Sequence, residues 1–100
     1  MEPVKLLGIA WYREDEWGDF KAACVDREVM ADSYEAWKRG AERGYQEMSG
    51  RGAHVHRVEI HLRDFLRWCE EQGVPANGKA RTNYVNWKLN RMYKAGEIEV

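Results

Sequence analysis

The sequence predicts a single α+β domain over residues 1–100, in which a two- or three-stranded sheet packs against about four helices. Three observations predict this class. The 100 residues, 44% of them hydrophobic, are enough for one core. Two short apolar runs are typical of strands, and four segments repeat apolar residues at helical spacing. Because so small a sheet is not stable alone, we expect two layers, with the helices on one face. The predicted order is β-α-α-β-α-α.

The first strand and helix are predicted near the N-terminus. The run from Lys5 to Tyr12 is short, apolar and aromatic, which predicts a mostly buried strand. Trp17, Phe20 and Cys24 then recur at helical spacing. A cluster of acids precedes them, and acids stabilise the N-terminus of a helix because they face the positive end of its dipole. We therefore expect a helix over about residues 15–25, followed by a connection over 26–32.

A second helix and a second strand follow. Asp32 or Ser33 can cap the helix, and Asp32 with Glu35 fits a capping box. The apolar stripe of this helix comprises Tyr34, Trp37, Ala41 and Met48, with Tyr45 beside it, and Gly50 and Gly52 end the helix. Val55, Val58 and Ile60 predict a strand over about 54–60, in which a bulge would restore the imperfect alternation.

The last two helices have the clearest patterns. Apolar residues at i, i+3, i+4 and i+7 predict a third helix that Gly73 ends; they are Leu62, Phe65, Leu66 and Cys69. A fourth helix starts at Asn77 or Gly78 and runs to about Ala95. The alternating tail Glu97–Val100 is compatible with a short third strand at the sheet edge.

Composition excludes several classes of protein. The net charge of -1 and the 12% aromatic content are not those of a disordered chain. No apolar run approaches the ~18 residues of a membrane span, and the first residues lack the pattern of a signal peptide. We therefore expect a cytoplasmic protein without a membrane partner. In such a protein, Cys24 and Cys69 are expected to be two buried thiols.

The residue patterns do not predict catalysis or a cofactor. His54 and His56 would share one strand face, and Cys69 or His61 could add a third zinc ligand, but this spacing is common by chance. The acids near residues 14–19 and 70–71 are explained by solvation and by the helix dipole. No serine has a G-x-S-x-G context. We expect a protein that is not an enzyme and holds no metal.

The fourth helix carries the most informative charge pattern. Residues 1–32 have a net charge of -4 and residues 79–100 a net charge of +3, and no acid occurs from Lys79 to Lys94. We predict a binding surface on this helix formed by Arg81, Tyr84, Trp87, Lys88 and Arg91. Cations with aromatic rings suit an acidic protein partner, or self-association with the acidic first third. Nucleic acid is the alternative, although a pI near 6.3 argues against it.

Several short strings also resemble a recurring pattern in small bacterial proteins of unassigned function. They are IAWYR at Ile9–Arg13, YEAW at Tyr34–Trp37, VHRVEI at Val55–Ile60, FLRWC at Phe65–Cys69 with Gly73, and Ala80 with Arg81. The similarity covers nearly the whole chain. It implies a bacterial, cytosolic, single-domain protein, and it carries over no activity, cofactor or functional residue. The function that we expect is therefore that of a small non-catalytic binding or accessory protein.

Overall fold

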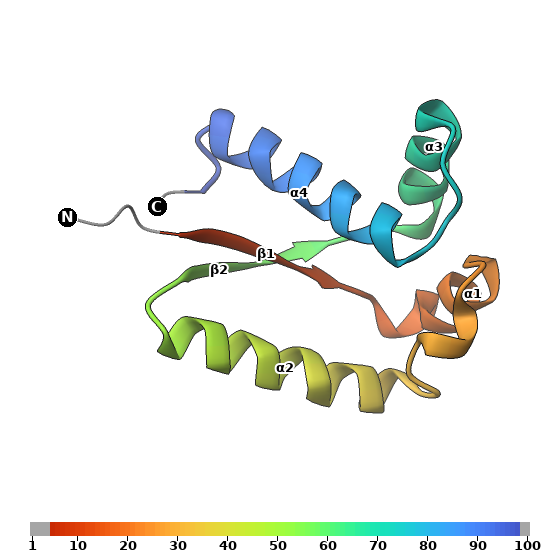
Figure 1. The fold of residues 1–100 in the computed structure, drawn as a ribbon, viewed down its shortest axis with the longest axis horizontal. Coiled ribbons are helices and arrows are strands. Elements are labelled where there is room, and N and C mark those ends of the chain that lie inside the picture. Colours follow the sequence, from red (N-terminus) through yellow and green to blue (C-terminus); the bar gives the residue numbers. More distant parts are fainter. Residues whose placement is uncertain (1–4, 99–100) are drawn as a thin grey trace.

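The computed structural model describes residues 5–98 and confirms the α+β class and the predicted order of elements (Figure 1). The elements are β1 (Leu6–Trp11), α1 (Glu14–Ala23), a 3-10 turn η1 (Arg27–Val29), α2 (Tyr34–Gly50), β2 (His54–Glu59), α3 (Leu62–Gln72) and α4 (Gly78–Lys94). In the predicted third strand, Glu97 and Ile98 form a bend, and residues 99–100 lie outside the described part. None of the helices described is both long and apolar enough to cross a membrane.

The sheet consists of two parallel strands, with Leu6 opposite His54 and Trp11 opposite Glu59. Parallel strands need a long crossover, which α1 and α2 provide. Because side chains alternate between the two faces of a strand, odd-numbered residues of both strands face one side and even-numbered residues the other. The guanidinium of Arg57 lies 4.7 Å from the ring centre of Tyr45 on α2, whereas Gly8 packs against Val85 on α4.

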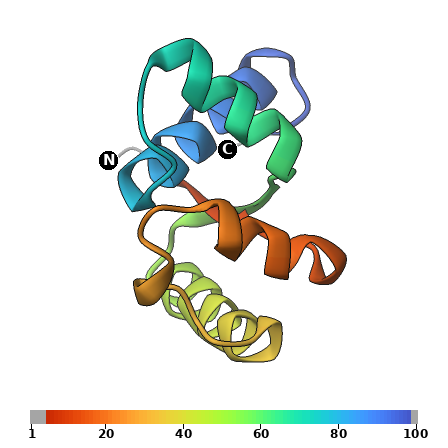
Figure 2. The ribbon, with the colours of Figure 1, turned by 90° about the vertical axis from the view of Figure 1, so that its right-hand side faces the viewer.

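Helices therefore cover both faces of the sheet, α2 on one and α4 on the other, and not the single face that we expected (Figures 1 and 2). This arrangement also explains the imperfect alternation in β2. Val55 and Val58 are both buried although they point to opposite faces, because each face has its own helix. The second strand therefore needs no bulge.

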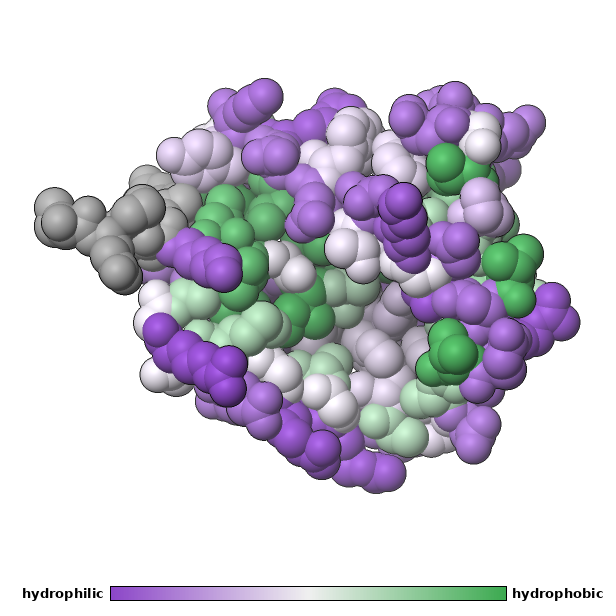
Figure 3. All heavy atoms as spheres, viewed as in Figure 1, coloured by the Kyte–Doolittle hydropathy of each residue, from purple (hydrophilic) through white to green (hydrophobic). Residues whose placement is uncertain are grey.

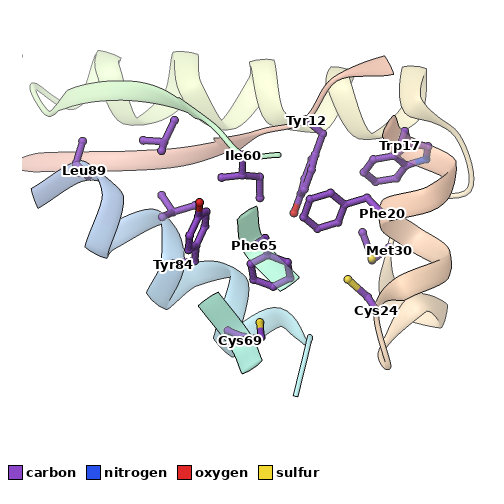
Figure 4. Close-up of a cluster of buried hydrophobic side chains, with 13 residues drawn as sticks. Tyr12, Trp17, Phe20, Cys24, Met30, Ile60, Phe65, Cys69, Tyr84 and Leu89 are labelled. Atoms are coloured by element: carbon purple, nitrogen blue, oxygen red, sulfur yellow. The ribbon is translucent and has the colours of Figure 1, made fainter. Parts of the chain in front are cut away.

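The main core lies between the α4 face of the sheet and helices α1, α3 and α4 (Figure 4). Phe20, Ile60 and Phe65 are completely inaccessible to solvent, and the Phe20 and Phe65 rings stack with centroids 5.3 Å apart. Cys24 and Cys69 are both buried and both free, as predicted. Burial raises the pKa of each thiol, which keeps both in the unreactive protonated form.

Two helices begin with side-chain caps. The Asn77 side chain accepts a hydrogen bond from the Ala80 amide at 2.9 Å, and Ser33 accepts one from the Ala36 amide at 3.1 Å. The capping box expected between Asp32 and Glu35 is therefore wrong: Ser33 is the cap, and the Asp32 carboxylate lies 3.4 Å from the Lys21 ammonium instead.

Candidate functional site

The strongest candidate site is a groove of about 470 Å³ between α3 and α4, called the α3–α4 groove below. Three aromatic side chains form its wall: Trp68 from α3, and Tyr84 and Trp87 from α4. The Tyr84 and Trp87 rings are stacked with centroids 5.6 Å apart, and the Trp68 ring meets Tyr84 edge-on at 5.5 Å. These contacts join the three rings into one continuous aromatic wall.

Charged side chains of both signs surround this aromatic wall. The cations are Arg67, Lys88 and Arg91, and the carboxylates are Asp64, Glu71 and Glu97. The guanidinium of Arg91 lies 4.9 Å from the centre of the Trp87 ring, and the Lys88 ammonium donates a hydrogen bond to the Glu59 carbonyl at the end of β2. Within residues 5–98, neither Arg67 nor Arg91 forms an ion pair. Their charges therefore remain available to a ligand.

The structure places the five predicted binding residues in three different environments. Trp87, which is 42% exposed, and Arg91 reach solvent, and Lys88 is half-buried beside them. Tyr84 is only 4% exposed and packs on Phe65 and Trp68, so it supports the groove from inside.

Arg81 has a structural partner on a distant segment. Its guanidinium forms a two-pronged hydrogen-bonded ion pair with Asp26, at 2.8 and 3.0 Å, and the Gly78 amide donates to the same carboxylate at 2.9 Å. The hydrogen bond from Arg81 is the main reason that the pKa of Asp26 is lowered. The Arg81–Asp26 ion pair connects the start of α4 to the segment after α1. It also neutralises one of the cations of the predicted binding surface.

Sequence reasoning missed the contribution of α3 to the groove. The spacing of Leu62, Phe65, Leu66 and Cys69 predicted the apolar stripe of α3, but it gave no indication that the Trp68 ring would meet α4. Asp26 had no local signal at all, because its partner is 55 residues away.

The histidines are not gathered into a ligand set. His54 and His56 lie on β2, whereas Cys69 is buried in the core on α3. His61 instead lies 3.5 Å from Glu16 and 3.8 Å from Glu59. In the part of the chain that the structure describes, no group of three His, Cys, Asp or Glu side chains is placed to hold a metal ion.

Comparison with known proteins finds no matching family model, no matching curated protein and no matching solved structure. The resemblance to small bacterial proteins therefore stays a prediction. Any statement about function depends on the geometry of the surface.

Proposed function

We propose that this protein is a non-catalytic binding protein whose α3–α4 groove binds an acidic segment of a protein partner. The observation that carries the proposal is the exposed Trp87 ring with the Arg91 guanidinium over it. A guanidinium that lies on an aromatic ring is already ordered, so it loses little entropy when it binds a carboxylate. Its planar N–H groups match the two carboxylate oxygens.

The other residues of the groove favour a partner that has both apolar and acidic residues. Trp68 and Trp87 offer an apolar contact area of the kind that is enriched at the centres of protein interfaces. Arg67 and Lys88 add cations from both helices, but Asp64 and Glu71 in the same groove would repel a continuous line of negative charge. A segment with spaced acids and an apolar anchor therefore fits better than a dense polyanion.

Nucleic acid remains the alternative ligand for this helix, and self-association the alternative partner. Neutralisation of Arg81 by Asp26 and the carboxylates of the groove both weaken the electrostatic attraction on which phosphate binding depends. The experiment below distinguishes an acidic segment from nucleic acid, because each predicts a different binding partner in solution.

The proposal is tested by fluorescence anisotropy with a labelled synthetic peptide in which Asp and Glu alternate with Leu and Phe. We expect saturable binding, and we expect Arg91→Glu to weaken it by about tenfold or more, which corresponds to one charge-assisted hydrogen bond or ~1.4 kcal/mol. The matched control is Lys79→Glu, an equal change of charge at an exposed position of α4 outside the groove. Arg81→Glu is unsuitable, because it would bring two carboxylates together at Asp26.

A peptide with Asn and Gln in place of the acids, and a short single-stranded DNA, serve as competing ligands. Equal binding of the acidic and neutral peptides, or equal loss in the Arg91→Glu and Lys79→Glu variants, would contradict the proposal. Tighter binding of DNA than of the acidic peptide would favour the nucleic-acid alternative.

A further inference from the structure

A second surface, remote from the α3–α4 groove, is the free edge of β1. We propose that this edge binds an extended segment of another polypeptide, which joins the sheet as a third strand. The inference does not depend on the proposed function, because it involves different residues and a different kind of contact.

The first argument comes from the directions of the backbone groups in β1. The His54 amide donates to the Lys5 carbonyl at 2.8 Å and the Ile60 amide to the Trp11 carbonyl at 3.2 Å. In a parallel ladder, bonding residues alternate along each strand, so the odd-numbered residues of β1 bond to β2. The N–H and C=O groups of Leu6, Gly8 and Ala10 therefore point away from β2.

Side chains of the described residues satisfy other outward-pointing groups of the sheet. The Tyr34 hydroxyl donates to the Tyr12 carbonyl at 3.2 Å, just beyond the end of β1, and Lys88 donates to the Glu59 carbonyl at the end of β2. Within residues 5–98, no hydrogen bond from another part of the chain reaches the backbone of Gly8 or Ala10 on the free edge. These groups are arranged to pair with a strand that residues 5–98 do not supply.

The second argument is that a groove lies along this same edge. A hollow of about 270 Å³, called the β1 groove below, lies between the first strand segment and α4. Its lining residues are Gly8, Ala10 and Tyr12 from the strand side, and Gly78, Arg81, Thr82, Val85 and Asn86 from α4; the Arg81 charge is already paired with Asp26. Gly8 has no side chain and Ala10 has a small one, so β1 itself places little side-chain bulk in this groove. Figure 3 shows apolar side chains gathered in the region of β1, between α4 and α2.

The other edge of the sheet is less suited to accept a strand. The residues of β2 whose backbone groups point away from β1 include the charged Arg57 and Glu59. In contrast, β1 has no charged residue from Leu6 to Trp11. Charged side chains are a common protection of edge strands, and β1 lacks it. The position of the open backbone groups and the absence of charge thus indicate the same edge.

A second copy of this chain does not fit as the occupant. If two β1 edges paired antiparallel, Leu6, Gly8 and Ala10 would pair among themselves, with the two Gly8 residues opposite each other across the two-fold axis. Val85 and Leu89 pack on Gly8, with side-chain atoms 3.0 and 3.2 Å from where a Cβ would be, so α4 lies directly over this point. Paired strands are ~4.8 Å apart, whereas packed helices need ~8–10 Å between their axes. The two α4 helices would collide, but an isolated strand has no such helix.

The surroundings also define the chemistry of the segment. Its side chains on the α4 side would meet Thr82 and Asn86, which favours small polar residues. Its side chains on the other side would lie next to Leu7 and Ile9, which favours Val or Ile. The expected ligand is therefore an extended, uncharged segment that alternates apolar and small polar residues.

The test uses a synthetic peptide of alternating Val and Ser between terminal lysines, titrated into ¹⁵N-labelled protein. We expect saturable shifts of the Leu6, Gly8 and Ala10 amide signals. A peptide that is N-methylated at every second residue should bind at least about tenfold more weakly, because it lacks the backbone donors. Asn86→Phe, which fills the β1 groove, should weaken binding by a similar factor, whereas Asn83→Phe, at an exposed position of the same helix outside the groove, should not.

Hydrogen exchange in the free protein provides a measurement that does not depend on the choice of peptide. The Gly8 and Ala10 amides should exchange at least about tenfold faster than the Ile9 amide, which bonds to β2. Equal protection of Gly8 and Ile9 would overturn the proposal, as would the absence of shifts at millimolar peptide or equal binding of the N-methylated peptide. Dimerisation of the protein through β1 would also overturn it, because the steric argument excludes that pairing.

Discussion

Replacement of Gly8 by alanine tests how closely α4 is seated on the sheet. An added Cβ would lie 3.0 Å from Val85 Cγ1, 3.2 Å from Leu89 Cδ2 and 3.2 Å from Val58 Cγ2. Carbon atoms prefer separations of ~3.5–4.0 Å, so three side chains of a close-packed core must each move. Such overpacking costs ~1–3 kcal/mol, while the loss of glycine freedom in the unfolded chain returns ~0.4–1 kcal/mol. We expect Gly8→Ala to lower the free energy of unfolding by about 1–2 kcal/mol.

The matched control is the same substitution at Gly18. This glycine lies within α1, and an added Cβ would meet nothing within 4 Å. Alanine is favoured over glycine by ~1 kcal/mol inside a helix, so Gly18→Ala should stabilise the protein. Urea unfolding followed by circular dichroism measures both changes. If Gly8→Ala were as stable as the unmodified protein, α4 could not pack on β1 as described.

Three further substitutions test the Arg81–Asp26 ion pair, the burial of Tyr12 in the core and the Asn77 helix cap. Asp26→Asn should cost about 1–3 kcal/mol at pH 7, because it leaves the Arg81 charge without its partner. The pKa of Asp26 is lowered in the folded state, so this difference from the unmodified protein should narrow in urea unfolding as the pH falls below ~4. Burial raises the pKa of Tyr12 to about 12 in the folded protein, so the hydroxyl ionises at a lower pH in the unfolded chain. Between pH ~10 and ~12, the free energy of unfolding of the unmodified protein should therefore fall by ~2 kcal/mol relative to that of Tyr12→Phe. An equal fall in both proteins would refute this expectation. Asn77→Ala should lower the free energy of unfolding by ~1 kcal/mol, since the Ala80 amide loses its acceptor, and an unchanged urea midpoint would argue against the cap.

The local patterns were sufficient to predict the elements but not the layers. The spacing of Leu62, Phe65 and Cys69 predicts α3 because one face of that helix is buried and the other is not. The alternation in β2 was misleading because it assumes a sheet with one buried face, whereas Val55 and Val58 are buried on opposite sides. How many faces a short sheet covers depends on where helices distant in sequence pack, and no window of neighbouring residues contains that information.

For the same reason, only part of the candidate site could be predicted. Trp87 and Arg91 belong to one helix, four residues apart, and their contact follows from helical geometry. The roles of Arg81 and Trp68 depend on tertiary partners, Asp26 on a connecting segment and Tyr84 on the opposite helix. A charge count along α4 cannot distinguish a cation that is neutralised inside the molecule from one that is free to bind.

The parallel pairing of the strands also has a consequence for the making of the protein. β1 is synthesised before β2, and about 48 residues must be added after Trp11 before β2 is complete; α4 is made later still. At ~5–20 residues per second, about 2–10 s pass before the uncharged stretch from Leu6 to Trp11 can pair with β2. Nascent chains in this interval expose an uncharged apolar strand, so the yield of folded protein should depend on how fast translation passes through α2.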